Sequence, residues 1–141
     1  MSNIEKFVGG LQALRGRLFH FTDSRNIESI KQHGLLTTQE LRERGIFAIT
    51  GGDEASLGID TAKGFDRYVR LSFCRHHPMS HDARERGSIE QLRILRVCPT
   101  VLLREGVLLA DRVATANESE LGPADDMILK MDYEATYRWM D

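Results

Sequence analysis

Three polar side chains that could bind a ligand lie close together near the start of the chain. His20, Thr22 and Asn26 occur in the stretch LFHFTDSRNIESIKQHGLL, residues 18–36. Apolar and polar residues alternate well enough to predict a strand over residues 17–22, in which side chains two apart share a face. A lone histidine in a strand is more often structural than ligand-binding. His20 and Thr22 on one face nevertheless favour a binding site.

A polar corner and a helix follow this strand. Asp23 or Ser24 can cap the helix by accepting a hydrogen bond from its free N–H groups. Gly34 is expected to end the helix, because glycine adopts the left-handed conformation without penalty. The bare backbone of a glycine also lets a ligand approach closely. Strand, corner and helix end together form the first candidate site.

A second group of possible ligands occurs in the stretch CRHHPMSH, whose zinc-binding residue types are Cys74, His76, His77 and His81. Their spacing is crowded, and the sequence has neither a second Cys-x-x-Cys half nor a His-Glu-x-x-His helix. We therefore predict no metal site, and a metal-dependent hydrolase is the weaker alternative. The sequence has no Gly-x-Ser-x-Gly turn, which a nucleophilic triad would require. It also has no Gly-Lys-Ser/Thr, which a phosphate-binding loop would require.

The remaining pattern predicts helices and strands that do not alternate strictly. Helices are expected at residues 1–15 and 38–44, in a turn after Pro99, and in the second half of residues 126–140. Strands are expected at residues 68–74, 91–97 and 106–111, and the first of these, YVRLSFC, is the clearest. The many Gly, Asp and Thr residues at 46–67 predict a long loop, and long loops in compact domains are often functional. This order favours an α+β fold over a doubly wound sheet.

Length and composition fit one globular domain. The chain has 141 residues and a formal net charge of −2, which does not indicate a nucleic-acid binder. Residues 61–104, however, hold nine Lys+Arg against four Asp+Glu, whereas residues 105–141 hold three against nine. The basic middle could attract phosphates, or the two halves could simply attract each other.

Cysteine content and hydropathy indicate in which cellular compartment the protein is found. Two cysteines, Cys74 and Cys98, are too few for a disulfide framework and are expected to be small buried side chains. The apolar runs are too short to span a bilayer, and the first residues lack the apolar core of a secretory signal. We expect a cytoplasmic protein with no membrane partner.

Four stretches of the sequence resemble, in order, the blocks of the DarT family of DNA ADP-ribosyltransferases. They are FHFTDSRNIESIKQHGLL, DRYVRLSFCRHHPM, LRILRVCPTVLLREGVLLADRVATANE and MDYEATYRWMD. The resemblance covers most of residues 18–141. It implies the ADP-ribosyltransferase fold, a split β-sandwich with flanking helices that grips NAD. It further implies that ADP-ribose is transferred to a base of single-stranded DNA, and that the protein is a toxin restrained by an antitoxin protein.

The resemblance also assigns residues. His20 would hydrogen-bond a ribose hydroxyl of NAD, with Thr22 and Asn26 supporting the nucleotide. The other implied NAD contacts are the backbone of Gly34 and Leu35, the aromatic ring of Tyr68, and Ser72. At the position of Ser72 the family commonly has an aromatic residue, whereas other ADP-ribosyltransferases use a serine. A DNA-binding face would contain Arg70, Arg75 and Arg84.

The sequence departs from the family pattern at the catalytic residues. The loop at 46–67 holds Lys63 and Arg67 but no convincing counterpart of the family's catalytic arginine. The family's catalytic glutamate is expected beyond the last residue, Asp141. The chain is then an N-terminal portion, a naturally short form, or a form in which Glu118, Glu120 or Glu134 substitutes. The expectation is NAD binding with poor transfer, and the alternative function is a catalytically incomplete module that binds NAD or nucleic acid.

Overall fold

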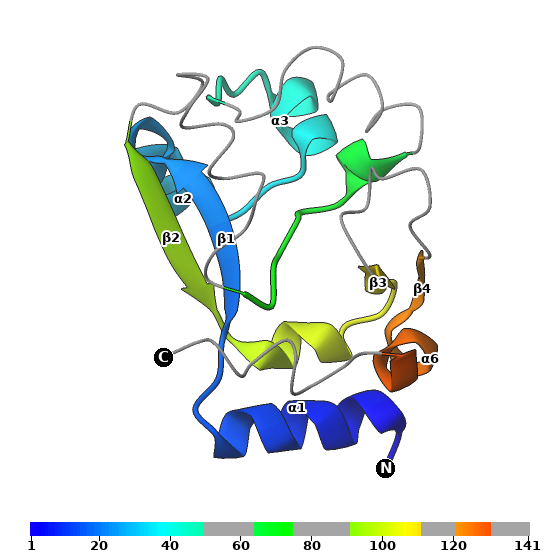
Figure 1. The fold of residues 1–141 in the computed structure, drawn as a ribbon. Coiled ribbons are helices and arrows are strands. Elements are labelled where there is room, and N and C mark those ends of the chain that lie inside the picture. The colour runs from blue at the N-terminus through cyan, green and yellow to red at the C-terminus, as the bar shows by residue number, and fades with distance from the viewer. Residues whose placement is uncertain (50–63, 75–90, 111–120, 131–141) are drawn as a thin grey trace. The chain divides into compact units, whose positions relative to one another are not determined.

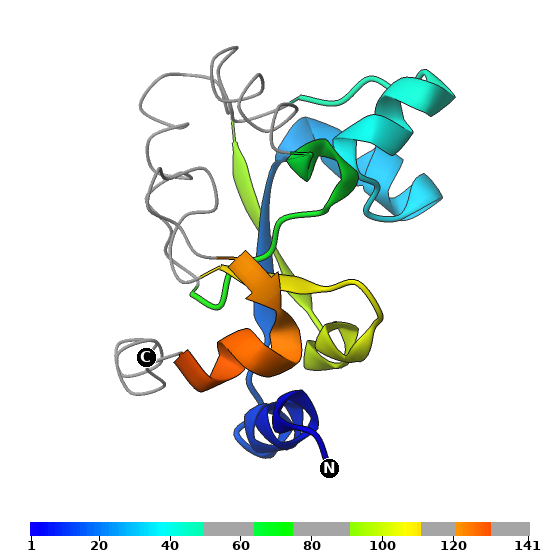
Figure 2. The same ribbon diagram turned by 90° about the vertical axis from the view of Figure 1, so that its right-hand side faces the viewer.

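The chain forms two compact units in the computed structural model. Figures 1 and 2 show the helices and strands of these units. The terminal unit contains Met1–Leu18 and Arg96–Asp141, and the central unit contains Phe19–Leu95. The structure describes residues 1–49, 64–74, 91–110 and 121–130. Within those ranges, no helix is long and apolar enough to cross a membrane.

The terminal unit is built around helix α1, Asn3–Ala13. Its first turn is closed by a capping box, in which the side chains of Ser2 and Glu5 each accept the other residue's backbone N–H. Residues at helical spacing form its buried face: Ile4, Phe7, Val8 and Leu11. This face packs against the 3-10 helix Pro99–Leu103 and against α6, Ala124–Met127. The helices predicted at the N-terminus and after Pro99 are thus confirmed.

A short sheet and a further helical turn complete this unit. Strand β3, Leu108–Ala110, pairs antiparallel with β4, Leu121–Pro123, with Leu109 opposite Gly122. The chain continues from α6 into the 3-10 helix Ile128–Lys130. The strand predicted near residues 106–111 is confirmed over its central residues. The helix predicted toward the C-terminus falls mainly on residues 131–141, which lie outside the described residues.

Strand β1, Leu18–Asp23, is the central element of the central unit. It pairs with β2, Leu92–Val97, and the N–H of Ser24 donates to the carbonyl of Gln91 at 2.8 Å. The end of β1 therefore meets the start of β2, and the two strands run antiparallel. Both strands were predicted from their patterns and are confirmed.

The prediction of a strand at residues 68–74 is wrong, because only Ser72 of this segment pairs with another strand. Phe19 and Ser72 exchange both backbone hydrogen bonds at 2.8 Å, which makes an isolated antiparallel bridge beside β1. The N–H of Tyr68 donates instead to Phe65 in a preceding helical turn, and the N–H of Cys74 donates to the Ser72 hydroxyl. Local turns therefore use the N–H groups at both ends of the segment, and a longer ladder does not form.

Three helical segments follow β1 in this unit. The 3-10 helix Ser24–Asn26 leads into α2, Ile27–His33, which ends at Gly34. Helix α3, Thr38–Arg44, begins with a capping box of Thr37 and Glu40 and ends at Gly45, which is left-handed. The predicted helices and both glycine ends are confirmed. A further 3-10 helix, Phe65–Arg67, is tied to α3 by an ion pair between Arg42 and Asp66 at 2.6 Å.

The described residues combine helices with two small antiparallel sheets, which confirms the α+β class. The split β-sandwich of the ADP-ribosyltransferases remains a prediction. The expectation of buried cysteines is wrong for Cys98, which is exposed, whereas Cys74 is half-buried. Cys98 follows the last residue of β2, where the alternation of the strand no longer decides which side chains are covered.

Gly34 should be the least replaceable glycine among the described residues of the central unit. Its φ of 82° and ψ of −177° lie in a region that is essentially restricted to glycine, although a Cβ at this position would meet nothing within 4 Å. We expect Gly34→Ala to lower the free energy of unfolding in urea by about 1–3 kcal/mol. Gly9→Ala is the control, because Gly9 lies inside α1 with open space around it and should gain about 0.5–1 kcal/mol. Equal effects of the two substitutions would contradict the conformational argument.

Candidate NAD site

His20 is half-buried in β1 and its ring is oriented by a backbone carbonyl. Its Nδ1 lies 2.9 Å from the carbonyl oxygen of Arg70. A carbonyl oxygen only accepts hydrogen bonds, so Nδ1 carries the proton and donates it. Burial lowers the pKa of His20 below its usual value of 6.5, and the hydrogen bond to Arg70 opposes this shift only partly. At neutral pH the ring is therefore mainly uncharged, and Nε2 carries a lone pair that can accept a hydrogen bond.

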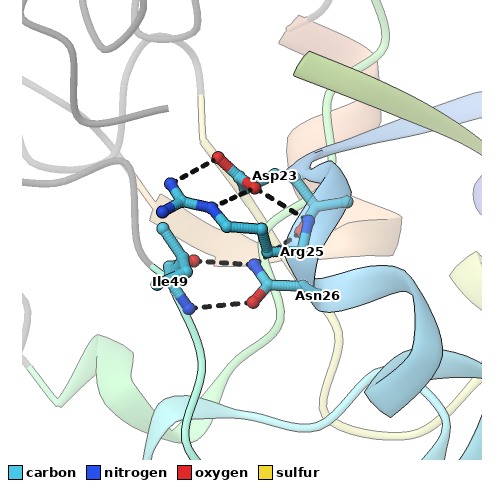
Figure 3. A network of polar contacts seen from close by, with 5 residues as sticks. Asp23, Arg25, Asn26 and Ile49 are labelled. Carbon is cyan, nitrogen blue, oxygen red and sulfur yellow. Dashed lines mark hydrogen bonds and ion pairs between the residues drawn. The ribbon is translucent and has the colours of Figure 1, made fainter. Parts of the chain in front are cut away.

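The side chain of Asn26 connects the corner that follows β1 to the backbone of Ile49 (Figure 3). Its Nδ2 donates to the Thr22 hydroxyl at 3.0 Å and to the carbonyl of Ile49 at 2.7 Å. Its Oδ1 accepts the N–H of Ile49 at 2.8 Å. Thr22 and Asn26 are both buried. The structure thus brings these two predicted site residues together, with the backbone of Ile49 as their common neighbour.

An ion pair between the buried Asp23 and the partly exposed Arg25 also holds this corner (Figure 3). The side chain of Asp23 is only 1% exposed and accepts two hydrogen bonds from the guanidinium of Arg25, at 2.8 and 2.9 Å. It also accepts the backbone N–H of Arg25 at 2.8 Å, as expected of a helix cap. A bidentate pair of this kind restrains direction as well as distance. The corner between β1 and α2 is therefore held by charged and neutral polar contacts together.

Three further predicted residues lie on the surface of the central unit. Gly34 is exposed and Leu35 is half-buried, directly after α2. Tyr68 is 43% exposed and follows the 3-10 helix Phe65–Arg67. Each is accessible to a ligand, but no described contact joins them to His20.

Ser72 lies on the edge of β1 but is not on the His20 face. Residues paired directly across an antiparallel bridge share a face, so Ser72 shares the face of Phe19. His20 is the next residue and points to the opposite face. The Ser72 hydroxyl accepts the N–H of Cys74 at 3.1 Å. A contact between Ser72 and NAD remains a prediction, and it requires the ligand to reach past the edge of β1.

Of the three arginines predicted for a DNA-binding face, the structure describes one. The guanidinium carbon of Arg70 lies 5.7 Å from the centre of the Phe65 ring, a cation–π distance. Arg75 and Arg84 lie outside the described residues, as do the histidines of the considered metal cluster, His76, His77 and His81. Among the residues that the structure does describe, no group of three metal-ligating side chains occurs.

Sequence reasoning missed the two backbone partners that organise the site. The carbonyl of Arg70 orients His20, and the peptide groups of Ile49 bind Asn26. No residue type marks a backbone acceptor, so neither partner could be identified from its own side chain. A histidine and an asparagine that become covered on folding, however, each require hydrogen-bond partners.

Comparison with known proteins identifies one family. The model of a family described as "ssDNA thymidine ADP-ribosyltransferase, DarT" matches residues 19–139, nearly the whole chain. No curated protein and no solved structure shows a significant match. The matched range includes every residue assigned above to the candidate site.

Neutral His20 should make the stability of the protein depend on pH. Because its pKa is lower in the folded than in the unfolded state, its contribution is fully present above about pH 6.5 and is lost as the pH falls through the folded value. We expect the free energy of unfolding in urea to decrease on acidification below pH 6.5. His20→Asn should flatten this decrease, whereas His33→Asn, at an exposed histidine of α2, should retain it because His20 is still present. Identical profiles for all three proteins would exclude His20 as the cause.

Proposed function

This chain belongs to the DarT family of single-stranded-DNA ADP-ribosyltransferases, and we propose that its central unit binds NAD and transfers the ADP-ribose to a thymidine base of single-stranded DNA. The observation that carries the proposal is the hydrogen bond from His20 Nδ1 to the Arg70 carbonyl. It leaves Nε2 as an acceptor, which is the group that a ribose hydroxyl requires as a partner. The same bond fixes the direction of the acceptor before the ligand arrives.

The proposed reaction exchanges one bond to ribose for another. The bond between the nicotinamide nitrogen and the ribose carbon breaks, and nicotinamide leaves with the electron pair. The thymine base donates an electron pair to the same carbon and loses a proton. The ribose carbon passes through an oxocarbenium-like state, which a carboxylate stabilises as in glycosidases. The candidate carboxylates Glu118, Glu120 and Glu134 lie outside the described residues.

The proposed NAD site lies on the surface of the central unit around His20. The ribose hydroxyl binds Nε2 of His20, and the hydroxyl of Thr22, on the same face of β1, can still donate its proton. The other proposed NAD contacts are the backbone of Gly34 and Leu35, the ring of Tyr68, and Ser72. Asn26 belongs to the site through its contacts with Thr22 and Ile49.

The biological role follows from the substrate. Modified bases in single-stranded DNA would block replication in the cell that makes the protein. We therefore propose a cytoplasmic toxin that a partner antitoxin protein restrains. The proposal rests on the family's substrate and makes no use of a particular contact in the structure.

Calorimetry of NAD binding tests His20 directly. His20→Asn retains an N–H donor close to the position of Nδ1 but has no atom at Nε2, so it removes only the acceptor. We expect affinity for NAD to fall by about tenfold, which corresponds to about 1.4 kcal/mol and lies within the range of one hydrogen bond.

The matched control is His33→Asn, which removes an exposed histidine from the same unit and should leave affinity unchanged. Thermal unfolding at neutral pH should confirm that both variants are folded. Wild-type affinity in the folded His20→Asn variant would remove His20 from the NAD site.

The salt dependence of DNA binding tests the three arginines. If Arg70, Arg75 and Arg84 each contact a phosphate, replacing all three with alanine should reduce the slope of log affinity against log salt by about 2, at about 0.7 per contact. A triple variant at the exposed residues Arg17, Arg44 and Arg104 removes the same charge and should change the slope less. Fluorescence anisotropy with a labelled single-stranded oligonucleotide measures both. Equal slopes for the two triple variants would show that only net charge matters.

A further inference from the structure

The side-chain amide of Asn26 has almost no capacity left for a ligand. Both protons of Nδ2 are donated, one to the Thr22 hydroxyl and one to the carbonyl of Ile49. One lone pair of Oδ1 accepts the N–H of Ile49. The residue is 8% exposed. A direct contact with a nucleotide could use only the second lone pair of Oδ1, unless it displaced one of these bonds.

The contact with Ile49 resembles one rung of a β-ladder. Asn26 offers an N–H and a C=O to the C=O and N–H of a single residue, at 2.7 and 2.8 Å (Figure 3). Two antiparallel bonds to one residue fix both its position and its orientation. One bond alone would leave the peptide free to rotate. Asn26 therefore determines where the backbone of Ile49 lies.

The residues before Ile49 are held at their other end as well. The N–H of Ile46 donates to the carbonyl of Leu41 at 2.9 Å, after the left-handed Gly45 ends α3. The segment 46–49 is thus attached at Ile46 to α3 and at Ile49 to the corner after β1. Asn26 also binds Thr22, which shares the face of His20. One side chain thereby connects this segment to the residues proposed to bind NAD.

We infer that Asn26 is a positioning residue, which holds the backbone of residues 46–49 beside the His20 face of β1 so that this segment forms one side of the NAD site. The inference rests on the proposed function for the identity of the ligand. It differs from a direct role because the amide acts through Ile49 and is already satisfied in the free protein. A preformed side of the site raises affinity, because binding then does not have to order the segment.

Hydrogen exchange and calorimetry together test this role. The amide of Ile49 should be protected from exchange in the free wild-type protein. In Asn26→Ala it should exchange at least about tenfold faster, while the amide of Phe19, bonded to Ser72, stays protected. NAD affinity should fall by at least about tenfold in the same variant. Asn3→Ala is the matched control, because the Asn3 amide donates only one long bond of 3.4 Å in the terminal unit, and it should change neither quantity.

Two results would overturn the inference. If Asn26→Ala loses NAD affinity while the Ile49 amide remains protected, Asn26 acts by direct contact. If protection is lost and affinity is unchanged, segment 46–49 is not part of the site. Loss of both in a variant whose Phe19 amide remains protected supports the positioning role.

A second variant and the wild-type protein keep the test decisive if Asn26→Ala does not fold. Asn26→Asp retains the acceptor for the Ile49 N–H but removes both donors, and it should weaken NAD binding by at least about tenfold. Wild-type affinity in Asn26→Asp, or an unprotected Ile49 amide in the wild-type protein, would overturn the inference. Absence of NAD binding by the wild-type protein would instead refute the proposed function, and the exchange of Ile49 would still report on the hydrogen bonds of Asn26.

Discussion

The hydrogen bond between His20 and the carbonyl of Arg70 depends on how short the backbone pairing is between β1 and the segment that contains Ser72. After the bridge of Phe19 with Ser72, the next hydrogen-bonded pair in a regular antiparallel ladder would be Phe21 with Arg70. Among the described residues, this edge of β1 carries only the isolated bridge, and the Arg70 carbonyl accepts from His20 instead. A longer strand would have used that carbonyl for backbone pairing. The irregular segment is therefore what allows a histidine inside β1 to be satisfied at Nδ1 and to keep Nε2 available.

In the corner after β1, too, the buried polar groups have hydrogen-bond partners. Thr22, Asp23 and Asn26 are the buried polar residues of the described chain, and each has a hydrogen-bond partner. An unsatisfied buried group would cost about 1–3 kcal/mol, so these contacts restrict the corner to one arrangement. Because Arg25 and Ile49 supply the partners, the corner holds both the start of α2 and a segment that lies more than twenty residues further along the chain. The polar contacts of this corner are consequently complete without a ligand.

The sequence predicted the elements that depend on local rules. Alternation located β1 and β2, and glycines located the ends of α2 and α3. The predicted cap Asp23 begins the 3-10 helix that leads into α2, and the two-residue spacing placed His20 and Thr22 on one face. The prediction failed at residues 68–74, where the alternation is good but local turns use the N–H groups at both ends. It also could not find the Arg70 carbonyl or the Ile49 peptide, because these partners lie 50 and 23 residues from the side chains that they bind. Backbone groups are identical at every position, and only the folded chain selects one of them.

His20 and Asn26 show why adjacent polar residues of one motif need not share a role. Both are polar residues near the end of the same strand, and both would be assigned to the ligand by spacing alone. Counting donors and acceptors separates them. His20 has two ring nitrogens, and its contact with the described chain occupies one, so the other can accept a hydrogen bond from a ligand. Asn26 has two amide protons, and Thr22 and Ile49 occupy both. A residue with an unused ring nitrogen is suited to binding a ligand, whereas a residue whose donors are both used is suited to holding the backbone around it.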